Sequence, residues 1–341
     1  MKIVHIESGF GNQMLSFAEY LVLKKLNPDD EIFIETLIYD IKECNDVICQ
    51  WNGYELDRVF GINAPNIKDY LGDEKWQIVK DYVVASKFWE NNWDYPAVYV
   101  EAFKLVGIEL KNWRGSTYWT PASSAKASLT NNRLGYFIKR VLRPFYQKRY
   151  IEKMSTHDKI FLRSDESVFT GQFLGLSNMD GEIDFVRDEI LQNFKFPPIT
   201  DERNLSVLSE IESTESVAIH ARRGDMLSSN GYCYKYGYFK RAVKYIRRHV
   251  KNPVFVFFGE PGSSEWCKEN LDMFGVRASD RTVFVDFNVG NDSYKDMYLM
   301  SKCKHNIVTN SSFGWWGAYL NQNPDKITCS SSVYINTNKH F

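Results

Sequence analysis

The sequence predicts an α/β fold in two domains, each with a parallel sheet. Its 341 residues exceed what one hydrophobic core usually serves. The chain opens with a short apolar run, followed by a glycine-containing turn and an amphipathic segment. From residue 216 onward, short apolar runs alternate with amphipathic segments. This alternation is typical of βα units whose strands form a parallel sheet with helices on both faces.

The opening segment predicts one βα unit. Residues 2–7 are expected to form a short buried strand, and residues 9–11 a tight turn. Residues 12–26 are expected to form a helix, because their apolar side chains recur at spacings of three and four residues. Residues 32–118 are irregular and rich in tryptophan and tyrosine, so they predict no clear elements.

Residues 136–151 interleave apolar side chains with basic ones. The basic side chains are those of Lys139, Arg140, Arg143, Lys148 and Arg149. A basic amphipathic helix can lie on an anionic membrane surface, so peripheral contact with the inner membrane surface is one interpretation. A solvated surface helix interrupted at Pro144 is the other.

The second half predicts four βα units after a break at Pro197 and Pro198. The expected strands are 216–219, 253–258, 282–286 and 306–309. The expected helices are 238–250, 264–274, 293–302 and 313–320. In sheets of this kind ligands bind outside the carboxyl ends of the strands. The residues that follow Ile219 and Thr309 are therefore the first candidates for a site.

Composition and charge exclude several classes of protein. The formal net charge of -1 lacks the basic excess of a nucleic-acid binder. The first residues carry no signal-peptide core, and no apolar run is long enough to span a bilayer, so we expect a cytoplasmic protein. The six cysteines form no C-x-x-C pair, and the chain has no Asp-x-Asp triplet. We therefore expect no metal site.

A pair of arginines follows the predicted strand 216–219. The run is His-Ala-Arg-Arg-Gly-Asp, from His220 through Arg222 and Arg223 to Asp225. Guanidinium groups match phosphate oxygens two at a time, and each charge-assisted bond contributes roughly 1.5–3 kcal/mol. A surface charge cluster is the alternative, but the position at a strand exit favours an anion site.

A second polar run follows the predicted strand 306–309. Asn310, Ser311 and Ser312 stand where a helix should begin, just before Phe313. The first amide N–H groups of a helix favour an anion. Helix capping by these side chains is a sufficient structural explanation on its own.

Three segments together resemble glycosyltransferase family 11, the α-1,2-fucosyltransferases. Members of that family open with Gly-Gly-Leu-Gly-Asn-Gln, carry a central His-x-Arg-Arg-Gly-Asp-Tyr and end with Asn-Ser-Ser-Phe-Ser-Trp-Trp-Gly-Ala. This chain has corresponding segments, in the same order, at residues 8–14, 220–225 and 310–318. The resemblance covers both ends of the chain and is thin between about residues 60 and 165.

The resemblance implies a GT-B-like arrangement, in which two Rossmann-like domains face a cleft. Residues 1–165 would form the acceptor-side domain, and residues 166–341 the domain that binds GDP-fucose. The implied enzyme transfers L-fucose from GDP-fucose to O2 of a terminal β-galactoside of a glycan and inverts the anomeric configuration. No cofactor or metal is implied, since arginines and a helix N-terminus would neutralise the pyrophosphate.

The resemblance also implies roles for individual residues. Arg222 and His220 are the implied catalytic residues, with Arg222 at the pyrophosphate and His220 at the nucleotide. Asp296 is implied at the guanine or the ribose. The other residues implied in donor binding are Gly11, Asn12, Arg223, Asp225, Asn310, Ser311, Ser312 and Phe313.

The chain departs from the family pattern at three places. Ser8 replaces the first glycine, Met226 replaces a tyrosine, and residues 258–261 (Phe-Gly-Glu-Pro) stand where many members have Ser-Asp-Asp.

Three other functions stay open: a fucosyltransferase of α-1,6 or O-fucosyl type, a non-catalytic glycan-binding protein, and an adhesion protein acting through its Arg-Gly-Asp tripeptide. The second would be expected to lack the arginines, and the third to carry an export signal. The sequence identifies no catalytic base.

Overall fold

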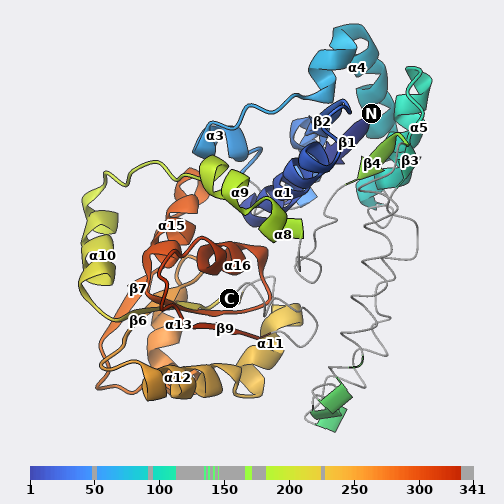
Figure 1. The fold of residues 1–341 in the computed structure, drawn as a ribbon. Coiled ribbons are helices and arrows are strands. Elements are labelled where there is room, and N and C mark those ends of the chain that lie inside the picture. Colours follow the sequence, from blue (N-terminus) through green and yellow to red (C-terminus); the bar gives the residue numbers. More distant parts are fainter. Residues whose placement is uncertain are drawn as a thin grey trace. The chain divides into compact units, whose positions relative to one another are not determined.

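The computed structural model describes residues 1–47, 52–90, 95–112, 166–170, 182–223 and 227–331, with a few positions between 134 and 145. The chain divides into two compact units: residues 1–129 and 144–195 form the first, and residues 130–143 and 196–341 form the second. Each unit has its own sheet, in blue to green colours for the first and yellow to red for the second (Figure 1).

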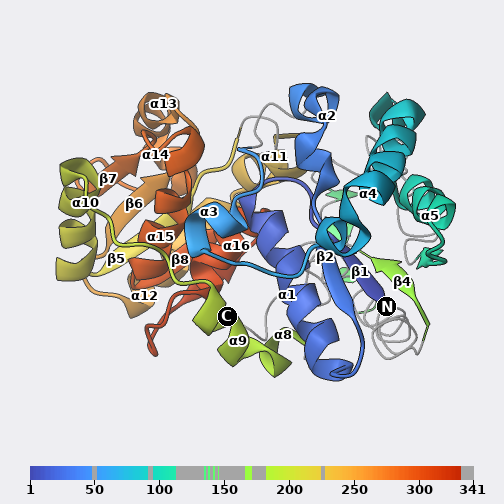
Figure 2. The same ribbon diagram turned by 90° about the horizontal axis from the view of Figure 1, so that it is seen from above.

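The first unit contains a four-stranded parallel sheet in the order β2-β1-β4-β3. Its strands are β1 Lys2–His5, β2 Ile32–Glu35, β3 Lys111–Asn112 and β4 Val168–Thr170. Its helices are α1 Phe10–Leu26, η1 Leu37–Asp40, α2 Lys42–Val47, α3 Leu56–Phe60, α4 Ile67–Ser86, η2 Phe88–Glu90, α5 Tyr95–Leu105, α8 Glu182–Phe185 and α9 Arg187–Asn193. α1 packs on β1 and β2, whereas α5 packs on β3 and β4 (Figure 2).

The pairing of β4 with β1 and β3 places residues beyond 165 in the first unit. The strand lies between β1 and β3, and Val168 is the register partner of both Lys2 and Lys111. The segment that follows it, as far as Lys195, also belongs to the first unit. The domain boundary expected at residue 165 precedes β4, which is only three residues long and gives no periodic signal.

The second unit contains a five-stranded parallel sheet in the order β7-β6-β5-β8-β9. Its strands are β5 Ser216–His220, β6 Val254–Phe258, β7 Thr282–Val285, β8 His305–Val308 and β9 Thr328–Ser330. Its helices are α10 Glu202–Ser213, α11 Leu227–Lys235, α12 Tyr238–His249, α13 Ser263–Glu269, α14 Leu271–Phe274, η4 Gly290–Asp292, α15 Tyr294–Lys302 and α16 Ser312–Tyr319.

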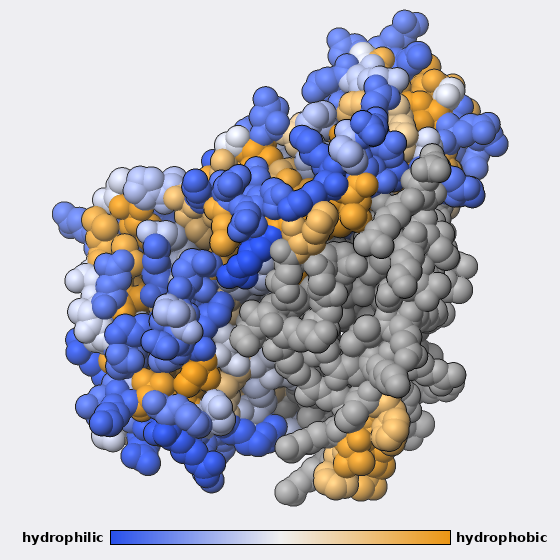
Figure 3. Space-filling view, viewed as in Figure 1, coloured by the Kyte–Doolittle hydropathy of each residue, from blue (hydrophilic) through white to orange (hydrophobic). Residues whose placement is uncertain are grey.

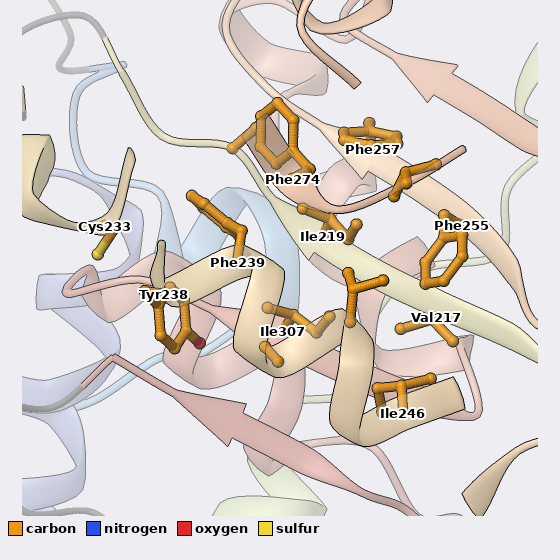
Figure 4. Close-up of a cluster of buried hydrophobic side chains, with 14 of the residues drawn as sticks. Val217, Ile219, Cys233, Tyr238, Phe239, Ile246, Phe255, Phe257, Phe274 and Ile307 are labelled. Carbon is orange, nitrogen blue, oxygen red and sulfur yellow. The ribbon is translucent and has the colours of Figure 1, made fainter. Parts of the chain in front are cut away.

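Both faces of the second sheet are buried, which explains its uninterrupted apolar strands. Val217 and Ile219 of β5 pack with Phe239 and Ile246 of α12 in one cluster (Figure 4). Ala218, between them in the sequence, belongs to a different cluster that contains residues of α10 and α15. Successive side chains of a strand point to opposite faces, so β5 contributes to two cores.

The predicted α/β class with parallel sheets is confirmed. Each of the four strands and four helices predicted in the second half overlaps an observed element, although helix 264–274 is interrupted at Asn270. α4 was not predicted from the sequence, although Trp76, Val79 and Val83 have helical spacing and are buried. A left-handed Gly72 (φ 72°) interrupts this helix and obscures its period. Among the described residues, no helix has the length and apolar character needed to cross a bilayer.

The turn between β1 and α1 differs from the one expected. Phe10 and Gly11 already belong to α1, so a turn at residues 9–11 is wrong. The left-handed residue is Ser8, with φ 71°. Glycine adopts this conformation at lower cost, which explains the glycine of the family pattern at that position. Tyr39 Oη and Gln13 Nε2 donate to the Ser8 carbonyl at 2.8 and 3.0 Å and hold the turn.

Candidate active site

The two arginines that follow β5 have different surroundings. The Arg222 side chain is 26% exposed, and its Nε lies 3.4 Å from Oε1 of Glu260. The guanidinium carbon of Arg223 lies 3.3 Å from the ring centroid of Trp266, a close cation–π contact. Neighbouring side chains of an extended segment point to opposite sides. Arg223 is therefore held against Trp266, whereas the Arg222 side chain stays partly exposed.

Glu260 fixes the same turn from the neighbouring strand. Its two carboxylate oxygens accept the backbone N–H of Arg223 at 3.0 and 3.2 Å. Tyr234 Oη donates to the carbonyl of Arg222 at 3.0 Å. The sequence analysis noted Glu260 only as a departure from a family pattern. Its contact with Arg223 depends on the pairing of β5 with β6, which no local sequence signal encodes.

His220, the last residue of β5, is buried and uncharged. Burial, together with the charge of Arg222, lowers the pKa of His220 to about 3. Its Nδ1 has no hydrogen-bond partner within the described part of the chain. The ring lies under the first turn of α16, where a Cβ on Gly314 would clash with Nδ1, and its centroid is 5.9 Å from that of Phe313. A neutral imidazole offers one donor and one acceptor.

The N-terminus of α16 follows β8, the strand beside β5. Ser311 occupies the N-cap position with extended backbone, but its side chain makes no capping hydrogen bond. Capping by Ser311 is therefore not the explanation of this run. Thr309 Oγ1 is also buried without a hydrogen-bond partner among the described residues. Uncapped amide groups and the helix dipole together favour an anion at this position.

Asp296 lies in the first turn of α15, beyond the end of β7. Burial raises the pKa of Asp296 to about 8, and the nearby charge of Asp286 acts in the same direction. Asn288 Nδ2 donates to Asp296 Oδ1 at 2.7 Å. Asn288 and Asn204 exchange two hydrogen bonds, at 2.8 and 2.9 Å. The sequence analysis missed both asparagines, which lie far apart in the sequence.

The expected site residues fall into two sets. In the second unit, His220, Arg222 and the start of α16 lie at the carboxyl ends of the adjacent strands β5 and β8, while Asp296 follows β7. Gly11 and Asn12 belong to the first unit, in the first turn of α1. Asp225 lies outside the described residues. The described residues contain no group of three or more His, Cys, Asp or Glu side chains placed to hold a metal ion.

Comparisons with known proteins identify similar sequences. A model of glycosyl transferase family 11 matches residues 136–338. An alpha-1,2-colitosyltransferase of Escherichia coli is 37% identical over 268 residues, which cover 73% of this chain and 84% of that protein. Human galactoside alpha-(1,2)-fucosyltransferase 1 is 29% identical over 147 residues, or 40% of this chain and 39% of that one. The crystal structure of fucosyltransferase NodZ from Bradyrhizobium aligns over 93% of this chain and 91% of its own, with 12% identity and a TM-score of 0.45.

Proposed function

The chain belongs to glycosyl transferase family 11 and is a glycosyltransferase, and we propose that it moves L-fucose from GDP-fucose to O2 of a terminal β-galactoside. The observation that carries the proposal is the juxtaposition of Arg222 with the uncapped N-terminus of α16, at the ends of adjacent strands. A guanidinium and a helix N-terminus can together neutralise a pyrophosphate. The carboxyl edge of a parallel sheet is where such a ligand binds.

The residue roles follow from this placement. Arg222 binds the pyrophosphate and balances the charge that grows as GDP leaves. Ser311, Ser312 and the first amide groups of α16 hold the phosphates, next to Asn310 and Phe313. The neutral His220 hydrogen-bonds the nucleotide, and Asp296 binds the guanine or the ribose. Arg223 supports the turn.

The two units have separate tasks in this proposal. The second unit binds the donor, and the first unit binds the acceptor. Gly11 and Asn12, in the first turn of α1, also contribute to donor binding in this proposal. The transfer inverts the anomeric configuration in a single displacement.

A donor and acceptor panel tests the function. We expect turnover of GDP-fucose with terminal β-galactosides and a product linked at O2 of galactose. Linkage analysis of the product separates the alternatives, because an α-1,6 or O-fucosyl product would assign the chain to another branch of fucosyltransferases. Turnover of UDP-galactose without turnover of GDP-fucose would refute the proposed donor.

A colitosyltransferase is the second candidate. Its support is the alpha-1,2-colitosyltransferase relative, which is 37% identical over 268 residues. Colitose is the 3-deoxy analogue of L-fucose, so both sugars fit the same arrangement of pyrophosphate and base. The decisive measurement is kcat/KM for GDP-fucose and GDP-colitose with one acceptor. A higher value for GDP-colitose would favour the second candidate.

Activity is expected to persist when divalent cations are removed. Arg222 and the start of α16 supply the positive charge that a metal ion supplies in other nucleotide-sugar enzymes. Transfer rates measured with and without EDTA check this. A strict requirement for added Mn²⁺ or Mg²⁺ would contradict it, whereas modest stimulation is compatible with assisted release of GDP.

Peripheral contact with the inner membrane surface, from a cytoplasmic location, is also part of the proposal. Several apolar side chains between residues 134 and 145 are exposed and form an orange group in Figure 3. They are Leu134, Phe137, Ile138, Val141, Leu142 and Phe145. The basic residues between them, Lys139, Arg140 and Arg143, lie outside the described residues, as do Lys148 and Arg149. A segment with apolar and basic side chains suits an anionic lipid surface.

Vesicle co-sedimentation tests the membrane contact. We expect binding to anionic vesicles at low salt, no binding to neutral vesicles, and loss of binding in Phe137→Asp. Tyr245→Asp is a matched control, because Tyr245 is a similarly exposed aromatic residue in α12. Failure of the wild-type protein to bind anionic vesicles at low salt would rule out the contact.

A further inference from the structure

A histidine and a carboxylate are buried together at the carboxyl edge of the first sheet. His5 ends β1, Glu35 ends β2, and the two are register partners. Nδ1 of His5 contacts Oε2 of Glu35, and neither side chain is exposed. The other Glu35 oxygen accepts the backbone N–H of Leu37. Because an ionised carboxylate only accepts hydrogen bonds, this geometry assigns the hydrogen of a neutral His5 to Nδ1.

The second nitrogen of His5 faces a second carboxylate. Nε2 lies 3.8 Å from Oε2 of Glu7 and has no hydrogen-bond partner among the described residues. The other Glu7 oxygen accepts a hydrogen bond from Tyr95 Oη at 2.9 Å. A lone pair on the imidazole therefore faces a lone pair on the carboxylate, and a single added proton can be shared by both.

Glu7 is the member of this group that a ligand can reach. Its side chain is 10% exposed, whereas those of His5 and Glu35 are fully buried. Glu7 lies between the end of β1 and the Ser8 turn, on the edge of the sheet where ligands bind in α/β proteins. Burying two carboxylates around a histidine has a desolvation cost that apolar side chains would avoid, so packing alone does not account for them.

The tyrosines near Glu7 cannot serve as bases. Burial, followed by the charge of Glu7, raises the pKa of Tyr39 well above its usual value. Burial, followed by the charge of Glu35, does the same for Tyr99. Both tyrosines therefore stay protonated in neutral solution. Tyr95 donates its hydrogen to Glu7 and so orients the carboxylate.

We propose that Glu7 is the general base of the transfer, and that His5, oriented by Glu35, shares the proton. The inference rests on the proposed function. The acceptor O–H bond breaks as its oxygen bonds to the anomeric carbon of fucose. The bond from that carbon to the phosphate oxygen breaks, and its electron pair leaves with GDP. The acceptor's proton goes to Glu7, which can then donate a hydrogen bond to Nε2 of His5.

The test compares Glu7→Gln with the wild-type protein. Loss of a general base costs typically about 10²–10⁴-fold, so kcat for transfer should fall by that factor while the KM for acceptor changes little. GDP binding, measured by calorimetry, should be retained, since Arg222, Asp296 and the start of α16 belong to the second unit. The acid limb of kcat/KM for the acceptor, measured at saturating GDP-fucose so that Asp296 does not contribute, should disappear. In Glu7→Ala, added formate should restore part of the rate by replacing the carboxylate.

Two further variants separate a catalytic role of Glu7 from a purely structural one. Glu19→Gln is a matched control. Glu19 is a buried carboxylate in α1 of the same unit, and it accepts a hydrogen bond from Thr170. Its substitution should affect stability but not kcat. Tyr95→Phe keeps the base and loses its orientation, so kcat should fall about tenfold or less with the acid limb still present. Near-wild-type kcat in folded Glu7→Gln, or an unchanged acid limb, would overturn the assignment. Failure of the proposed function is a different result, because it would appear as an absence of fucosyl transfer by the wild-type protein.

Discussion

Arg222→Lys is expected to lower kcat by about 10²–10³-fold in a protein that remains folded. The guanidinium must neutralise charge that develops as the bond between fucose and phosphate breaks, so it stabilises the transition state more than the bound donor. Lysine keeps the charge but loses the planar pair of donors that matches two phosphate oxygens. The KM for GDP-fucose should therefore rise less than kcat falls. Steady-state kinetics of the two proteins measures both values.

Arg223→Lys is the matched control for Arg222→Lys. The guanidinium of Arg223 lies over Trp266, and Glu260 accepts the backbone N–H of Arg223, so this residue supports the turn rather than the ligand. Arg223→Lys should lower the melting temperature and leave most of kcat. Near-normal kcat in Arg222→Lys beside an inactive, folded Arg223→Lys would mean that the two roles are reversed.

Asp296→Asn is expected to weaken GDP binding by about 10–100-fold, because hydrogen bonds to a charged partner contribute roughly 1.5–3 kcal/mol. The N–H groups of guanine and the hydroxyls of ribose are donors, so they bind the ionised carboxylate, which accepts through both oxygens, more strongly than the protonated one. The pKa of Asp296 in the empty protein is raised to about 8, so at neutral pH this carboxyl holds a proton that GDP must displace. GDP affinity should therefore rise with pH up to about 8 and then level off. Calorimetry in buffers of different ionisation enthalpy measures the released proton.

The same binding experiment distinguishes guanine from ribose as the group that Asp296 binds. If Asp296 binds guanine, the wild-type protein should prefer GDP to inosine diphosphate, which lacks the 2-amino group, and Asp296→Asn should lose that preference. If Asp296 binds the ribose, the preference should survive the substitution. Asp201→Asn is the control, since Asp201 belongs to the same hydrogen-bond network and asparagine is an equally good N-cap for α10. GDP binding that is independent of pH and unchanged in Asp296→Asn would exclude both roles.

The sequence by itself determined the second unit and the place of its site. Apolar runs predict β5, β6, β7 and β8, because both faces of their sheet are buried and each strand must be apolar throughout. The arginines and the Asn-Ser-Ser run directly follow two of these strands, so the strand positions also indicated where the proposed anion site lies. These inferences depend on neighbours in the sequence, which is why they needed no three-dimensional information.

Only the tertiary structure decided which distant residues meet. Glu260 meets the Arg223 backbone because β6 lies beside β5, and Glu35 meets His5 because β2 lies beside β1. The extent of the first unit likewise depends on β4 pairing with β1 across most of that unit's sequence. Strand order and register result from the packing of the whole sheet rather than from local propensity. The proposed anion site could therefore be inferred from the sequence, whereas the proposed base could be recognised only after folding had brought His5, Glu7 and Glu35 together.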